Sequence, residues 1–304
     1  MLLENERFQQ ACNFIIKHAR ALDRNLFEYH FEIGSRDDVR RELVKYQNSD
    51  GGFGNALESD FRLKASSPMA TSVGLRYCNE IQLDSSDIVI ESAIRYLMNT
   101  YQNNGGYWPF TFMDVNEEPH APWWHADKIS APSETRWSNP NAEIVGYLNQ
   151  YAIHVPDRLL SIVNERAQRN LESSKHIEGL VYDIICWNHA YSHLPDSLRK
   201  LAVEEIERTI HNIIPSVQET LREVRIFSLA PNPQSLLYQL YPDVVDALIT
   251  SEITKQSNDG GWWPTWRWGQ YEEEWEIAKT EWAGKLTAEC LIALDKFNLI
   301  ESSE

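Results

Sequence analysis

Most residues that could do chemistry in this chain gather in two segments rich in tryptophan. All but Trp187 of the 11 tryptophans lie within residues 108–137 or 262–282. These segments, together with residues 58–71, also hold carboxylates, histidines and arginines. An indole ring beside a carboxyl group excludes water, which raises the pKa of that group toward the range of a proton donor. The composition of these segments therefore predicts an aromatic ligand pocket with a few carboxylates.

Four carboxylates are candidates for a catalytic acid or base. Glu281 stands between Thr280 and Trp282 at the predicted start of a helix. It could donate a proton there, although a glutamate in the first turn more commonly complements the helix dipole. Asp60 and Glu58 follow the first Gly-Gly pair, and Glu143 opens the helix that follows the second pair.

Aromatic and polar side chains of the same segments are candidates for contact with a substrate. Tryptophan beside a Gly-Gly pair most simply packs on the turn, as we expect for Trp108 and Trp262. For Trp123 and Trp124, packing within a lid and contact with a ligand remain equally open. The predicted substrate-binding residues are Trp123, Trp124, His125, Asn141, Trp263, Trp266 and Trp282.

One short segment has the ligand types of a metal site. His120, His125 and Asp127 form the pattern His-x4-His-x-Asp in a predicted loop. This spacing matches no strong zinc pattern, and the cysteines lie elsewhere in the chain. We therefore expect neither a metal nor a cofactor.

Helical periodicity dominates the chain, and no alternating strand pattern of useful length occurs. One helical stretch is predicted over residues 8–22, and another from Val39 into the first Gly-Gly pair. Later helices are predicted to begin near Ser67, Asp87, Asn139, Asp157, Glu178, Asp196, Ser216, Pro242 and Thr280. Long loops are predicted at about residues 105–138 and 260–279.

A short phrase recurs three times, each time after an apolar helical run. A glutamine, a short polar stretch, two glycines and an aromatic residue follow one another from Gln47, from Gln102 and from Gln256. The glycines supply backbone conformations that a tight reversal needs, and the glutamine amide can bond loose backbone at the end of the helix. Such a repeat indicates the architecture more strongly than any single residue does.

These phrases resemble the prenyltransferase and squalene-oxidase repeats, also called QW repeats, of terpenoid cyclases and protein prenyltransferase β subunits. The resemblance implies an all-α fold, a single α/α toroid over residues 1–304 with about six inner helices wrapped by outer helices. The chain is most similar to uncharacterised bacterial members, through residues 67–72, 119–124, 139–143, 256–262 and 281–284. The Asp-x-Asp-Asp acid motif of the cyclases and the Asp-x-Cys zinc element of the prenyltransferases are absent, so the resemblance implies the fold and not the activity.

Composition narrows the range of partners. A net charge of −17 argues against binding to nucleic acid or to an anionic membrane surface. No apolar run is long enough to span a membrane, and the N-terminal residues lack the pattern of a signal peptide. The 4 scattered cysteines predict reduced thiols and a cytoplasmic protein.

Three functions remain open. In the first, the toroid binds a small, largely apolar ligand in its central cavity, and a carboxylic acid starts an isoprenoid transformation of the terpenoid-cyclase or prenyltransferase kind. The second is a carbohydrate-active or carbohydrate-binding toroid, in which tryptophans stack on sugar rings and two carboxylates face each other. The third is a non-catalytic scaffold closed by its own tryptophan loops.

Overall fold

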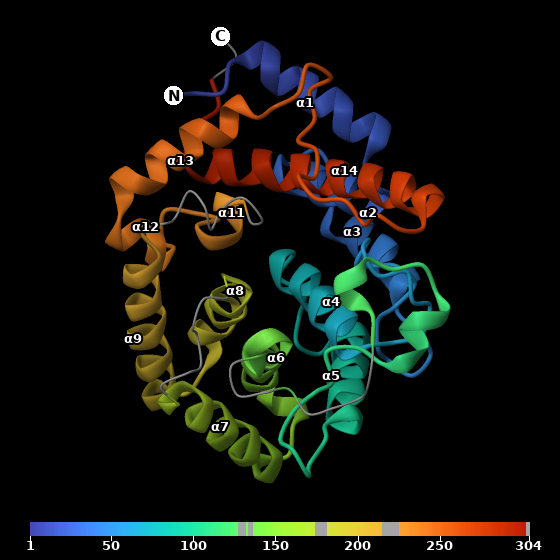
Figure 1. Ribbon diagram of the computed structural model, residues 1–304, viewed down its shortest axis with the longest axis vertical. Helices are drawn as coiled ribbons and strands as arrows, with labels where there is room; N and C mark the ends of the chain where they lie inside the picture. The colour runs from blue at the N-terminus through green and yellow to red at the C-terminus, as the bar shows by residue number, and fades with distance from the viewer. Residues whose placement is uncertain (127–131, 133–135, 174–180, 215–224, 302–304) are drawn as a thin grey trace. The chain divides into compact units, whose positions relative to one another are not determined.

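The computed structural model describes residues 1–126, 132, 136–173, 181–214 and 225–301 (Figure 1). Within these ranges the chain forms helices and only isolated β-bridges, so the predicted all-α class is confirmed. The chain folds into two compact units. One combines Met1–Leu43 with Val217–Glu304, and the other is Val44–Ser216. We call them the terminal unit and the central unit.

The central unit is built from two rows of helices (Figure 1). We call one row the inner row because a larger share of its side chains is buried; it consists of α4 (Pro68–Glu80), α6 (Ser138–Gln150) and α8 (Val181–Ala190). The outer row consists of α5 (Ile88–Thr100), α7 (Asp157–Glu172) and α9 (Asp196–Ile213). Every side chain of α6 between Pro140 and Leu148 is buried, whereas α7 buries only one face. This contrast is the one expected between an enclosed helix and an amphipathic surface helix.

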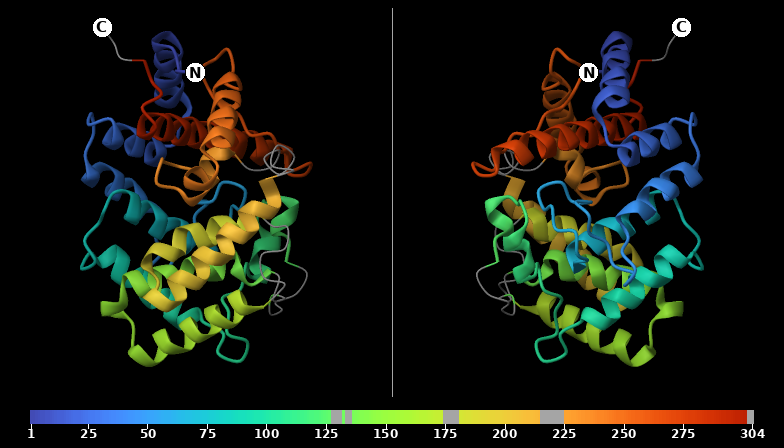
Figure 2. Two further views of the ribbon diagram at one scale, coloured as in Figure 1. Left: turned by 90° about the vertical axis from the view of Figure 1, so that its left-hand side faces the viewer. Right: turned by 90° about the vertical axis from the view of Figure 1, so that its right-hand side faces the viewer.

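The terminal unit joins the two ends of the chain. Its helices are α1 (Asn5–His18), α2 (Ala21–His30), α3 (Arg36–Leu43), α11 (Ile226–Leu229), α12 (Leu236–Leu240), α13 (Pro242–Thr254) and α14 (Glu272–Lys296). The longest helix, α14, packs against α1 and α2. The backbone N–H of Leu3 donates to the carbonyl of Leu299 at 2.8 Å, so the segments that hold these two residues lie side by side (Figure 2).

Helix starts with a strong local signal are confirmed. Ser67 caps α4 by accepting from the backbone N–H of Ala70, and Asp87 caps α5 by accepting from that of Val89. The predicted starts at Asp157, Asp196 and Pro242 also hold. Those near Glu178 and Ser216 lie outside the described residues.

Two helix predictions are wrong. The stretch over residues 8–22 is two helices, because Ala19 and Arg20 have extended backbone between α1 and α2. The helix predicted from Thr280 already begins at Glu272, so the loop predicted over residues 260–279 ends eight residues early, at Tyr271. The acidic run Glu272–Glu274 forms the first turn of α14, where negative charge complements the helix dipole.

The three repeated phrases form turns with one shared hydrogen bond. In each, the backbone N–H of the aromatic residue six positions after the glutamine donates to a polar side chain of the helix that follows. Phe53 donates to Thr71 Oγ1 at 3.0 Å, Trp108 to Asn141 Oδ1 at 2.6 Å and Trp262 to Thr287 Oγ1 at 2.9 Å. Because each of them accepts this bond, α4, α6 and α14 occupy equivalent positions in the three repeats.

The first and third turns also share their contact with a second helix. The Gln47 amide donates to Gly51 and to Val89 of α5, and the Gln256 amide donates to Gly260 and to Arg7 of α1. All four of these distances are 2.8 or 2.9 Å. Helix α1 therefore contacts the third turn in the same way as α5 contacts the first turn.

One glycine of each turn needs a left-handed backbone. It stands four positions after the glutamine, with φ of +90° at Gly51, +67° at Gly106 and +93° at Gly260. A Cβ atom on Gly51 would lie 2.3 Å from the carbonyl oxygen of Ser92, and one on Gly260 would lie 2.4 Å from that of Gln10. These glycines are therefore required both by conformation and by close approach of a helix.

The four cysteines are free thiols, and all but Cys12 are buried. None of the helices in the described ranges combines the length and the apolar run needed to cross a lipid bilayer.

Candidate functional site

The inner helices of the central unit approach each other closely at one glycine. A Cβ atom on Gly146 of α6 would lie 2.6 Å from the Cα atom of Ala190 on α8. Because Gly146 has no side chain, the two helices pack tightly along their length. This packing brings Glu143, one turn before Gly146, next to His189.

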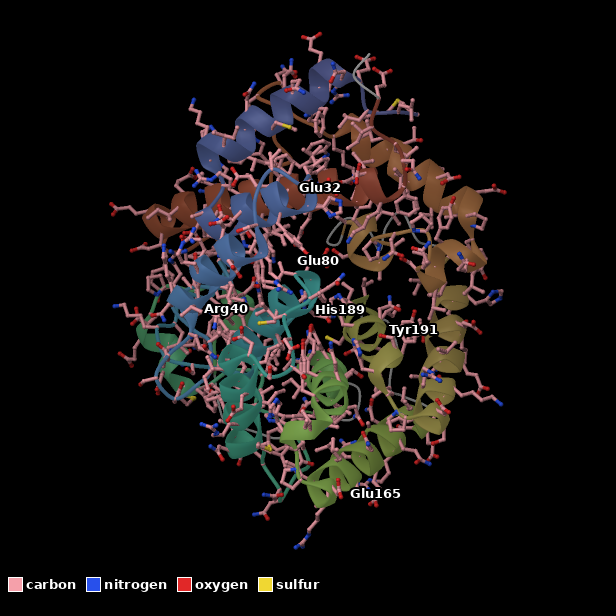
Figure 3. All side chains as sticks on the ribbon, turned by 180° about the vertical axis from the view of Figure 1, so that it is seen from behind. Glu32, Arg40, Glu80, Glu165, His189 and Tyr191 are labelled. Carbon is pink, nitrogen blue, oxygen red and sulfur yellow. The ribbon has the colours of Figure 1, made fainter. Side chains whose placement is uncertain are left out.

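Glu143 is the centre of a cluster of polar side chains from three helices. Its carboxylate is 2 % exposed and accepts two hydrogen bonds from the Arg76 guanidinium of α4, from Nε at 3.0 Å and from a terminal nitrogen at 2.8 Å. The Tyr147 hydroxyl donates to Glu143 Oε1 at 2.9 Å. His189 Nδ1 lies 3.2 Å from the same oxygen, close enough for an ion pair though not aligned for a hydrogen bond. Figure 3 labels His189 among the side chains.

These neighbours fix the charge of the cluster. Burial alone would raise the pKa of Glu143, but the charges of Arg76 and His189 outweigh it and hold the pKa well below its usual range. The pKa of Tyr147 is raised well above its ordinary value by burial and by the Glu143 carboxylate. At neutral pH the cluster thus contains an ionised Glu143 and a protonated Tyr147. An ionised, fully paired carboxylate accepts hydrogen bonds well and is a poor proton donor.

Asp183 on α8 is in the opposite situation. It is 1 % exposed, and neither of its carboxyl oxygens has a hydrogen-bond partner among the described residues. Burial raises the pKa of Asp183 to about 7, and the charge of Arg136 opposes this only in part. A carboxyl group with such a pKa is half protonated near neutral pH and is suited to donate or accept a proton.

Cys186 lies on α8, three residues after Asp183. The pKa of its buried thiol is raised well above its ordinary value by burial, then by Glu143 and Asp183. Arg76 opposes this rise. The thiol therefore stays protonated, which makes Cys186 a poor nucleophile. Glu143 and Asp183 thus both act electrostatically on the same thiol.

Asp60 and Glu58 lie in a second place in the central unit, where two loops run side by side. The Ala121 N–H donates to the Asp60 carbonyl at 2.8 Å, and Phe61 and His120 form a β-bridge. Asp60 is 4 % exposed and Glu58 is half-buried. The segments that follow the first two turns therefore lie side by side at these loops.

The tryptophans of this loop pair differ in accessibility. The Trp124 ring is stacked between Phe61 and Phe110, with ring centroids 5.0 and 4.6 Å apart, and is 6 % exposed. This sandwich favours the interpretation of Trp124 as loop packing. Trp123 is 49 % exposed and His125 is exposed, so both can reach a ligand.

The histidines of the same loop face each other. His120 Nε2 lies 3.3 Å from His125 Nδ1, and His120 Nδ1 lies 2.6 Å from the Glu118 carbonyl oxygen. Asp127, the third residue of the predicted pattern, lies outside the described residues. Among the residues that the structure describes, no three His, Cys, Asp or Glu side chains gather closely enough to hold a metal ion.

Asn141 has a structural task in α6. Its side chain is fully buried, accepts from the Trp108 N–H and donates to the Trp137 carbonyl at 2.8 Å. Thr71 and Thr287 make the equivalent pair of bonds in α4 and α14. The prediction of Asn141 as a substrate contact therefore competes with its role in closing the second turn.

The remaining candidates lie in the terminal unit. Glu281 lies well inside α14, so the dipole role suggested by a helix start is wrong. Neighbouring Trp282 meets Trp266 edge to face at 5.2 Å and lies under the Lys285 ammonium at 4.8 Å. Trp263 instead belongs to its turn, because its ring N–H donates to Asp259 at 3.0 Å.

Arg76 and His189 of the polar cluster, and Asp183 beside it on α8, could not be predicted as site residues. They lie within helical runs and far from Glu143 in the chain. No local spacing connects them. The only signal available was a charged residue within an otherwise apolar helical run, as in residues 181–187.

No family model, curated protein or solved structure matches this chain.

Proposed function

We propose that the chain is an α/α toroid that binds a small molecule against its inner helices and uses Asp183 as the acid in a transformation of that molecule. The toroid is supported by the three equivalent turns, which lead into the equivalent helices α4, α6 and α14. It is further supported by α1, which stands to the third turn as α5 stands to the first. In a toroid this substitution closes the ring with the N-terminal helix.

The observation that carries the reaction is the buried carboxyl of Asp183, which has no hydrogen-bond partner among the residues that the structure describes. The role that the sequence suggested for Glu281, an acid kept neutral by burial near indole, fits Asp183 better. Trp187 follows four residues later on the same face of α8, and its ring lies 6.4 Å from that of Trp137. Such indole faces can stabilise a cation that forms when an isoprenoid alkene or epoxide accepts the proton.

A carbohydrate-active protein is the second candidate. It is favoured by the opposite pKa shifts of Glu143 and Asp183, since paired carboxyl groups pushed apart in this way serve as acid and base in glycoside hydrolysis. The three hydrogen bonds already made to Glu143 count against it, because they leave that carboxylate little freedom to act on a sugar.

A ligand screen followed by product analysis tests the proposal. The chain is incubated with isoprenoid alcohols and triterpenes or with oligosaccharides, and the melting temperature and the products are recorded. A ligand at a hundred times its Kd adds about 2.7 kcal/mol of stability. We expect stabilisation by isoprenoids, and conversion that is lost in Asp183→Asn but kept in the exposed control Asp246→Asn.

Other outcomes discriminate among the three functions. Stabilisation by sugars alone would reject the isoprenoid reaction in favour of the carbohydrate function. Binding of isoprenoids with unchanged conversion in Asp183→Asn would reject Asp183 as the acid. If neither ligand set changes the melting temperature or yields a product, the non-catalytic scaffold is favoured.

A further inference from the structure

Glu143 holds two side chains that can carry positive charge, one from each neighbouring helix. It binds Arg76 of α4 through Nε and one terminal nitrogen, and it lies 3.2 Å from His189 Nδ1 of α8. The Glu143 carboxylate already accepts three hydrogen bonds and carries a negative charge, so Glu143 itself does not bind an anion. The side chains of Arg76 and His189 are accessible to a ligand, since they are 39 % and 29 % exposed.

The atoms left over on these two side chains can donate hydrogen bonds, Nε2 of His189 when its ring carries both protons. The second terminal nitrogen of Arg76 makes no hydrogen bond to any described residue, and it carries two N–H groups. The carboxylate beside His189 Nδ1 favours a proton on that nitrogen, which leaves Nε2 at the far edge of the ring. A protonated imidazole donates from Nε2 as well.

We propose that Arg76 and His189, held in place by Glu143, form a binding site for an anionic group, a carboxylate or a phosphate, on the ligand of this protein. The inference deepens the proposed function and rests on it only in taking this side of α4, α6 and α8 as the ligand-binding side. Guanidinium N–H groups match the oxygen spacing of carboxylate and phosphate. Because Nε and one terminal nitrogen are fixed by Glu143, the remaining nitrogen is pre-oriented, which lowers the entropy cost of binding.

The site also explains why the cluster is polar within an otherwise apolar helix row. A buried ion pair gives little net stability by itself, because desolvation offsets the attraction. The pair of Glu143 and Arg76 also orients the remaining Arg76 nitrogen for binding, which is a role other than stability. The expected ligand then has an apolar body and one anionic end.

Three probes with the same alkyl chain test this inference: octanoate, octyl phosphate and octanol. Binding to the full chain is measured by calorimetry. We expect octanoate or octyl phosphate to bind about tenfold more tightly than octanol, and the ratio between the two anions identifies which headgroup is preferred. Arg76→Lys keeps the charge beside Glu143 but loses the fork, and His189→Gln leaves the pair of Arg76 and Glu143 intact.

Each of these two variants should reduce the preference for the anion about fivefold or more, while the exposed control Arg199→Lys should leave it unchanged. Melting curves without ligand show whether the variants fold. Equal binding of all three probes, no binding of any, or a preference that survives in both variants would overturn the inference. A preference for the anion without isoprenoid conversion would reject the proposed function alone, and conversion without the preference would reject only the anion site.

Discussion

Replacing Asp183 by asparagine should remove a specific pH dependence from the stability of the protein. The unfolded chain releases the Asp183 proton near the ordinary pKa of 3.8, whereas the folded chain holds it until about pH 7. Between these values the folded state binds more protons than the unfolded state, so the free energy of unfolding falls as pH rises. The contribution is greatest below the unfolded pKa and is lost once pH passes the folded pKa.

The size of this effect follows from the two pKa values. The interval from 3.8 to about 7 corresponds to about 4 kcal/mol at 1.36 kcal/mol per pKa unit. Urea unfolding at pH 4, 5, 6, 7 and 8 measures it as the difference between wild type and Asp183→Asn. That difference should fall by about 4 kcal/mol from pH 4 to pH 8, which makes the variant relatively more stable in alkaline buffer.

Other titrating groups cancel in this comparison. Burial lowers the pKa of His193, which makes stability rise with pH in part of the same window, but the shift is common to both proteins. Asp246→Asn removes an exposed carboxylate from α13 and should follow the wild-type profile. Parallel profiles for wild type and Asp183→Asn would show that Asp183 is ionised or solvated in the folded protein, and the acid role would fail with it.

Three further predictions concern packing and charge. Gly260→Ala should lower the free energy of unfolding by about 3 kcal/mol or more, because φ at this residue is +93° and a backbone oxygen would lie 2.4 Å from the new Cβ atom. Gly269→Ala, where φ is +70° and no atom lies near the new Cβ atom, should lower it by about 1 kcal/mol. Equal losses for the two variants in urea unfolding would refute the close approach at Gly260. Gly146→Ala should cost about 1–3 kcal/mol by forcing α6 from α8, and an unchanged melting temperature would contradict that contact. Glu143→Gln should cost about 2 kcal/mol at pH 7 by leaving Arg76 without its counter-charge, which urea unfolding measures; a neutral effect would argue against the pair.

Local signals explain which parts of the fold could be predicted. Ser67 and Asp87 sit directly before apolar runs, and their side chains cap the helices that follow. The start of α14 could not be predicted because residues 272–279 carry four glutamates and a lysine. Their apolar face is narrow, with Trp275 and Ala278 buried, so the sequence of this segment resembles that of a polar loop. The break at Ala19 was missed because apolar residues on both sides continue the helical period.

The polar cluster could not be predicted from the sequence for a different reason. Glu143 was a candidate because it opens a helix after a turn, but its partners are set by which helices become neighbours. Arg76 and His189 reach it only because α4, α6 and α8 pack in one row, and the closeness of α6 to α8 depends on Gly146. The raised pKa of Asp183 likewise comes from tertiary burial, which a short sequence window does not contain.

The repeated turns help to position the polar cluster, because each turn fixes how the helix that follows it is rotated about its axis. Asn141 receives the N–H of Trp108 and so fixes the rotation of α6 about its axis. Glu143 follows two residues later and therefore points away from the turn, toward α4 and α8. At the equivalent position α4 has Val73 and α14 has Glu289, which contacts Lys285. The same scaffold thus presents a different side chain at each repeat, and it is in α6 that the side chain is a buried carboxylate able to organise a site.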